Sequence, residues 1–322
     1  MTLHEQPITC LRMYALVAKE EAPMSAIPFE RLNLFGDQIC VRDPRGRSPR
    51  PALVPCMGPT GRVLAIHGGF TVLQRFSITP LEGKAFVDTS KDANPIHTED
   101  SVISGAMTAA RLLILPEILV PSLQVKSFRI KFRAFSRYDR ATVNRFTFVP
   151  NGDGGFTVDL AVHQQGVPVA HGTLKTTSTH ALGAGEALPR DAGETAGRRK
   201  TLWGRSAPAP RCDAPADLIC DWYRSLRMEP EHAFKYLGYG YPRAFLASLP
   251  SGEMVRQSGA PGLLNGLNLQ FPESGIPALS QGTSPTVEVA PVRPRNSFRK
   301  VLANVASGMV TYCTGYATVL LT

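Results

Sequence analysis

An acidic side chain and a histidine lie five residues apart in the stretch Asp92-Ala-Asn-Pro-Ile-His97. Pro95 fixes its own φ and disfavours a helical conformation for Asn94, so this stretch should turn rather than continue as a helix. A turn can bring Asp92 and His97 toward a common point. An Asp and a His that converge on one pocket can share the two proton transfers of an elimination or a hydration. The alternative is a surface turn that happens to contain both residue types.

The segment after this turn predicts a buried helix. Residues 105–115 are apolar on most sides, as expected for a helix in a core. Pro116 and Pro121 should end this helix. Because Gly105 has no side chain, the backbone at the start of the helix can approach a ligand closely.

Strands are predicted on both sides of the helix. Residues 69–79 are enriched in β-branched and aromatic residues, and 123–135 alternate apolar with basic side chains. Further strands are expected at 143–149, 156–162 and 167–177, with a hairpin turn signal at 151–155. A buried helix with a run of antiparallel strands indicates an α+β fold, in which a sheet curls around the helix.

The composition fits a globular protein with a basic surface. The chain has 322 residues, enough for two domains of roughly 150 residues, with 43% hydrophobic and 19% charged residues. The formal net charge of +9 favours anionic partners. Apart from the strand at 123–135, basic residues are not interleaved with aromatic ones, so we do not expect a nucleic-acid partner.

The cysteines and the apolar segments bear on metal binding and location. None of the cysteines forms a C-x-x-C pair or a Cys/His set with zinc spacing, so a metal site is not expected. The N-terminus has no basic region followed by an apolar core, which argues against a secretory signal. The most apolar segment, 105–120, is interrupted by Arg, Pro and Glu, which argues against a membrane span. We therefore expect a cytoplasmic protein in a reducing compartment. The six cysteines are Cys10, Cys40, Cys56, Cys212, Cys220 and Cys313.

The chain contains a Gly-, Ala-, Pro- and Arg-rich connector at 181–211, which could end in an edge strand near Leu202. After this connector the order of turn motif, helix and strands starts again. The second copy, Arg227-Met-Glu-Pro-Glu-His232, aligns with Asp92–His97, and Gly240 then matches Gly105 without a gap. The colinear order of these matches predicts a tandem duplication, against the alternative of coincidence among common residues.

In this alignment Arg227 replaces Asp92. An arginine stays protonated and cannot act as an acid or base near neutral pH. The sequence thus predicts one working site per chain, in the first half, and a structural role for His232.

Preceded by Phe86 and Ser90 and followed by Gly105-Ala-Met-Thr-Ala, the stretch Asp92–His97 resembles the hydratase-2 motif of MaoC-type dehydratases. The resemblance covers roughly residues 70–180, and residues 200–322 resemble the degenerate half of the fused members of this family. It implies a tandem hot-dog fold, each half an antiparallel sheet wrapped around a central helix. The implied domains are an N-terminal extension at 1–60, a catalytic hot dog at 61–180, a linker at 181–211 and a degenerate hot dog at 212–322.

The resemblance also implies an activity, the interconversion of (R)-3-hydroxyacyl and trans-2-enoyl thioesters, without a cofactor. Asp92 and His97 would be the catalytic acid and base. The backbone N–H of Gly105 would stabilise charge on the thioester oxygen. Asn94 would orient the turn or hold a water. The substrate would be carried by coenzyme A or an acyl carrier protein, in polyketide or fatty acid biosynthesis.

Some features depart from the family pattern. Lys91 stands where the family usually has glycine, and only seven residues separate His97 from Gly105. These departures leave open a non-catalytic acyl-thioester-binding protein, while the fold leaves open a thioesterase. Because two hot dogs in one chain reproduce a paired arrangement, with the two sheets joined edge to edge, we expect a monomer or a homodimer.

The strand at 123–135 carries Arg129, Lys131 and Arg133 on one face, near Arg137 and Arg140. Two interpretations of this basic strand are open. It can be a solvated face, or a docking surface for the phosphates of coenzyme A or for an acidic carrier protein.

Overall fold

The computed structural model describes residues 37–42 and, with several gaps, residues within 69–321. The described ranges are 37–42, 69–92, 94–97, 99, 101–119, 123–152, 155–178, 214–237, 240–258, 262–272, 285–295, 298–307 and 310–321. The expected connector and the strand near Leu202 lie outside them. No helix among these residues is both long and apolar enough to cross a membrane.

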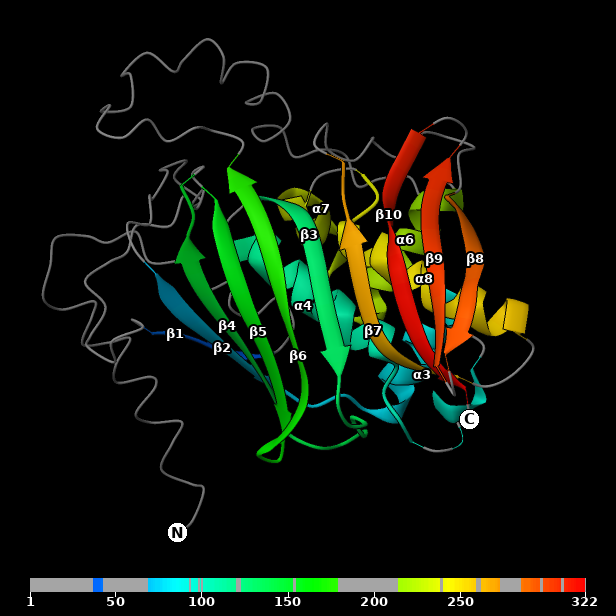
Figure 1. Ribbon diagram of the computed structural model, residues 1–322. Helices are drawn as coiled ribbons and strands as arrows, with labels where there is room; N and C mark the ends of the chain where they lie inside the picture. Colours follow the sequence, from blue (N-terminus) through cyan, green and yellow to red (C-terminus); the bar gives the residue numbers. More distant parts are fainter. Residues whose placement is uncertain are drawn as a thin grey trace, which may run out of the picture.

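Ten strands form one continuous antiparallel sheet, and the helices lie behind it in Figure 1. The sheet order is β1-β2-β4-β5-β6-β3-β7-β10-β9-β8. The strands of the first half are β1 (Gln38–Arg42), β2 (Phe70–Phe76), β3 (Leu123–Phe132), β4 (Thr142–Pro150), β5 (Phe156–Gln164) and β6 (Val167–Ser178). Those of the second half are β7 (Gly262–Gln270), β8 (Thr286–Arg295), β9 (Phe298–Ser307) and β10 (Val310–Leu321).

The helices fall into two comparable sets. The first half contains α3 (Pro80–Ser90), the 3₁₀ turn η1 (Pro95–His97) and α4 (Gly105–Leu119). The second half contains α6 (Ala214–Ser225), α7 (Pro230–Leu237) and α8 (Arg243–Ser258). Each half is therefore a sheet wrapped around a central helix, α4 or α8, and this confirms the predicted fold class.

The two half-sheets join edge to edge through β3 and β7, as expected. In this antiparallel pair Arg129 lies opposite Asn268. These two residues are equivalent when Phe128–Phe132 is aligned with Leu267–Phe271. Equivalent residues face each other only at a local two-fold axis. The register thus supports the tandem duplication.

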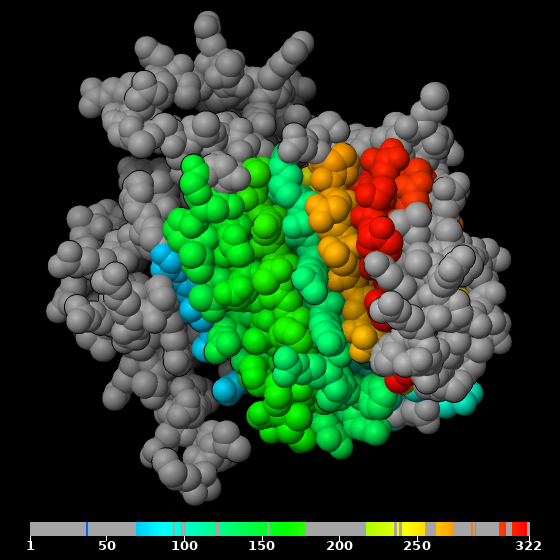
Figure 2. All heavy atoms as spheres, viewed as in Figure 1, coloured from blue at the N-terminus to red at the C-terminus, as the bar shows by residue number. Residues whose placement is uncertain are grey.

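Alternation along β3 matches the sequence prediction. Phe128 and Ile130 are buried against the helices, whereas Arg129, Lys131 and Arg133 are exposed on the outer face of the sheet. This outer face is the one presented in Figure 2.

The central helices pack against each other in opposite directions. Arg243, at the start of α8, forms an ion pair with Glu117 near the end of α4, with 3.1 Å between Nη1 and Oε1. Of the two prolines predicted to end this helix, Pro116 lies inside α4, which continues to Leu119, two residues before Pro121. Every residue from Ala106 to Leu119 is buried, so packing on all sides outweighs the roughly 3 kcal/mol that an internal proline costs.

Helix α3 was not anticipated, although the sequence carries its start signal. Thr79 and Glu82 form a reciprocal capping box, and Pro80 occupies the first helical position. The residues from Phe86 to Ser90 are therefore helical, and the chain turns only at Lys91. Lys91 has a left-handed backbone, with φ of 56°.

The structure shifts the alignment by one residue at the start of the two motif copies, before the prolines. Lys91 and Arg227 are the left-handed residues that follow α3 and α6. Asp92 and Met228 come next, and each donates its N–H to the carbonyl five residues earlier, at 3.0 Å. Met228 rather than Arg227 therefore occupies the position of Asp92. The second half still lacks the acid, because this methionine is buried and cannot exchange protons.

Candidate active site

The turn after α3 places Asp92 in the interior. The left-handed conformation of Lys91 ends the helix and directs the next residue between α4 and α8. The Asp92 side chain is completely buried. A carboxylate in such a position needs hydrogen-bond donors, since burial of an unpaired charge is costly.

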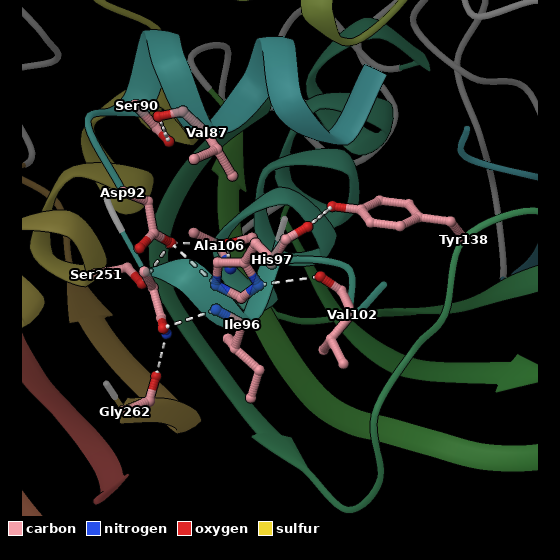
Figure 3. A network of polar contacts seen from close by, with 12 residues as sticks. Val87, Ser90, Asp92, Ile96, His97, Val102, Ala106, Tyr138, Ser251 and Gly262 are labelled. Atoms are coloured by element: carbon pink, nitrogen blue, oxygen red, sulfur yellow. Dashed lines mark hydrogen bonds and ion pairs between the residues drawn. The ribbon is translucent and has the colours of Figure 1, made fainter. Parts of the chain in front are cut away.

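Three groups surround one oxygen of Asp92 (Figure 3). Oδ2 accepts hydrogen bonds from Ser104 Oγ at 3.0 Å and from Ser251 Oγ at 3.1 Å, and it lies 3.5 Å from His97 Nε2. The other oxygen, Oδ1, is buried and has no hydrogen-bond partner among the described residues. The carboxylate is thus held through Oδ2, and Oδ1 is the buried polar atom of the site that lacks a described partner.

His97 is brought to Asp92 by the turn η1, so the predicted acid and base do converge. Its Nδ1 lies 3.0 Å from the carbonyl oxygen of Val102. A carbonyl can only accept, so Nδ1 carries a hydrogen and Nε2 is the ring atom that can gain or lose a proton. The separation of 3.5 Å from Asp92 Oδ2 is longer than a normal hydrogen bond. Apo active sites often show such loose pairs.

Tyr138 supports the backbone of His97, a role that no local pattern in the sequence indicates. Its hydroxyl donates to the His97 carbonyl at 3.0 Å. Burial, together with the negative charge of Asp92, raises the pKa of Tyr138 to about 12. Its ring occupies the space beside Gly83 of α3, where any Cβ would overlap it.

Asn94 ties the motif to the second half of the chain. Its Nδ2 donates to the carbonyl of Gly262, the first residue of β7, at 2.5 Å. Its Oδ1 accepts from Ile96 N at 3.4 Å. Asn94 therefore orients the turn in this structure.

Ser104 and Gly105 begin the central helix beside the acid and base. The Ser104 carbonyl accepts from Thr108 N at 3.2 Å, and its Oγ accepts from Ala106 N at 3.2 Å, so Ser104 is the N-cap. Gly105 follows at the first helical position. A side chain there would come within 3.2 Å of Leu264 and 3.3 Å of Phe132. The helix N-terminus thus presents its partial positive charge in the same region as Asp92.

His232 lies apart from this arrangement. Pro95 and Pro230 each begin a helical turn, η1 and α7, and the histidine is the third residue of each. His97 is buried, whereas His232 is exposed. The described residues of the second half therefore form no equivalent pair.

The site combines a buried carboxyl, an imidazole and a helix N-terminus. This combination can move protons and stabilise a developing negative charge. Among the residues that the structure describes, no three His, Cys, Asp or Glu side chains are grouped as a metal site.

Comparison with known proteins supports the fold. A MaoC-like dehydratase superposes with a TM-score of 0.50 at 11% identity, over 76% of this chain and 95% of that one. A Mycobacterium tuberculosis protein described as having a double hot-dog fold gives 0.50 at 10% identity, over 77% and 94%. The 12:0-ACP thioesterase from Umbellularia californica gives 0.42 at 7% identity, over 78% and 94%.

No family model and no curated protein matches the sequence. At these identities the likeness to solved structures shows the fold alone. The chain has a double hot-dog fold, and its resemblance to the MaoC-like double hot-dog proteins is confirmed at that level.

Proposed function

We propose that this protein is a 3-hydroxyacyl-thioester dehydratase, or enoyl-thioester hydratase, with one working site formed by Asp92 and His97. The observation that carries this proposal is the unpartnered, buried Oδ1 of Asp92, on the same carboxylate whose Oδ2 lies 3.5 Å from His97 Nε2. A reversible loss of water needs one group that takes a proton from carbon and one that gives a proton to the departing hydroxyl.

The pair can perform both transfers with a single proton. In dehydration, unprotonated Nε2 of His97 takes the α-proton of the thioester, and protonated Oδ1 of Asp92 gives its proton to the leaving hydroxyl. In hydration, Asp92 takes a proton from water and His97 returns one to the α-carbon. The Val102 carbonyl keeps the Nδ1 hydrogen in place throughout, so only Nε2 exchanges.

Removal of the α-proton places negative charge on the thioester oxygen. The N-terminus of α4 favours such a charge, and the backbone N–H of Gly105 is the proposed donor. Glycine suits this position, because a Cβ there would crowd Leu264 at 3.2 Å and Phe132 at 3.3 Å.

The proposed substrates are acyl thioesters of coenzyme A or of an acyl carrier protein, such as the intermediates of polyketide or fatty acid biosynthesis. The exposed basic residues of β3 favour an anionic carrier. A thioesterase remains the second enzyme candidate because a thioesterase shares this architecture. A non-catalytic thioester-binding protein is the third.

Mass spectrometry of the products from a panel of 3-hydroxyacyl and enoyl thioesters tests the proposal. A mass difference of one water molecule between substrate and product supports the proposed activity, whereas release of free thiol identifies a thioesterase. Asp92→Asn and His97→Ala should each reduce turnover at least 100-fold without unfolding the protein. His232→Ala is the matched control, because this exposed histidine should not affect turnover. Wild-type turnover by Asp92→Asn or by His97→Ala would refute the proposed function.

A further inference from the structure

Ser251 reaches the candidate site from the second half of the chain. It lies on α8, is buried, and donates its hydroxyl to Asp92 Oδ2 at 3.1 Å across 159 positions of sequence. The next residue, Gly252, packs against the backbone of Lys91. The helix and the hydroxyl are thus both fitted to the turn that carries Asp92 (Figure 3).

The bond made by Ser251 differs from those of other buried helical serines. Ser248 donates to the Phe245 carbonyl at 2.6 Å, and Ser225 donates to the Trp222 carbonyl at 2.6 Å. Serines in helices commonly bond to their own backbone in this way. Ser251 instead bonds to a buried carboxylate in the other half, which is a stronger, charge-assisted interaction.

We infer that Ser251 is a positioning residue for Asp92, so that the second half, which has lost its own acid, completes the site of the first. This inference rests on the proposed function. Ser104 and Ser251 approach Oδ2 from the two halves, at 3.0 and 3.1 Å. Two donors on one oxygen fix the rotation of the carboxyl group and leave Oδ1, the oxygen assigned to proton transfer in the proposed function, pointing away from them.

The test compares Ser251→Ala with Ser248→Ala in the full chain, with crotonyl-coenzyme A as the substrate. The two serines are buried on the same helix, and each loses one hydroxyl. Ser251→Ala should lower kcat about tenfold and leave KM within about twofold. Ser248→Ala should change none of these. Equal effects in the two variants would overturn the inference.

Two further variants separate hydrogen bonding from packing and from failure of the proposed function. Ser251→Cys fills the same space with a weak donor, so it should stay impaired, and full recovery would mean that packing alone matters. In an Asp92→Asn background, Ser251→Ala should cause no further loss in kcat, and an additive tenfold loss would contradict action through Asp92. If Asp92→Asn itself retains full turnover, the proposed function fails, whatever Ser251 does.

Discussion

Gly252 of α8 lies directly against the carbonyl oxygen of Lys91. A Cβ at Gly252 would be 2.5 Å from that oxygen and 3.0 Å from Asp92 N. The contact places backbone of the second half against the residue that precedes the candidate catalytic acid. The arrangement of Asp92 therefore depends on how closely α8 can approach.

Gly252→Ala should both destabilise the protein and lower its turnover. The added methyl group must push apart two backbone segments, which typically costs about 1–3 kcal/mol, and the displacement reaches Asp92 directly. Denaturant unfolding and steady-state kinetics measure the two effects. Gly152→Ala is the control, because no atom lies within 4 Å of its Cβ and its stability should change by less than about 0.5 kcal/mol. Wild-type stability and turnover of Gly252→Ala would show that α8 and the backbone at Lys91 and Asp92 move apart easily.

Local patterns predicted much of the fold. The apolar run at 105–115 indicated the central helix, and the alternation at Phe128–Phe132 identified both faces of β3. Pro116 does not end α4, because it is tolerated when every neighbouring residue is buried. Helix α3 was missed although Thr79 and Glu82 form its capping box. This start signal is local, so α3 is predictable from the sequence.

The site was only partly predictable, for a different reason. The spacing of Asp92 and His97 indicated the pair, and Ser104 before Gly105 is a usual N-cap signal for the start of the helix. Ser251 carries no such signal, because its role arises only when α8 packs against α4. Likewise, nothing near Tyr138 in the sequence indicates that it supports His97. Contacts between distant segments follow from the tertiary fold, and no local periodicity encodes them.

Tyr138 should make the folded protein sensitive to alkaline pH. Burial and the charge of Asp92 raise its pKa from 10 to about 12, so an unfolded chain releases this proton before the folded protein does. The Tyr138 contribution to stability is complete below pH 10 and is lost as the pH rises toward 12. Tyr138→Phe should therefore lose less stability over this range, although at neutral pH it lacks the bond to the His97 carbonyl, worth about 1 kcal/mol. Unfolding curves at pH 8 to 11.5 provide the measurement, with exposed Tyr316→Phe as the control.

The ion pair between Glu82 of α3 and Arg227, which follows α6, should make this contact between the two halves sensitive to acid. Partial burial opposes ionisation of Glu82, but hydrogen bonds from Arg227 and Thr79 outweigh it and lower the pKa of Glu82. The stabilisation is present above the ordinary value of 4.5 and is lost as the pH falls through the lowered value. Arg227→Met should thus cost about 1 kcal/mol at pH 7 and progressively less below pH 4.5.

The control for this pair is Arg224→Met. Arg224 forms an exposed ion pair with Asp221 at 2.6 Å, which should contribute little. Urea unfolding at pH 7 and pH 3 compares the two variants with the wild type. If the cost of Arg227→Met is the same at both pH values, the loss reflects packing of the arginine stem rather than its charge.

Arg129 and Lys131 of β3 should attract an anionic carrier to the outer face of the sheet. The potential there is already positive enough to lower the pKa of His171, through partial burial and through repulsion by Arg133, Lys131 and Arg129. Replacing Arg129 and Lys131 by glutamate should raise KM for a coenzyme A or carrier-protein thioester several-fold at low salt, and less at 0.5 M salt. The matching N-acetylcysteamine thioester lacks phosphates, so its KM should not change.

A charge-matched variant, Lys84→Glu with Arg224→Glu, alters exposed residues of α3 and α6 behind the sheet. It should leave KM for every substrate within about twofold, because these charges lie on the opposite side of the sheet. A rise in KM equal to that of the β3 variant would indicate a general effect of net charge. No rise in either variant would mean that the basic strand is a solvated face.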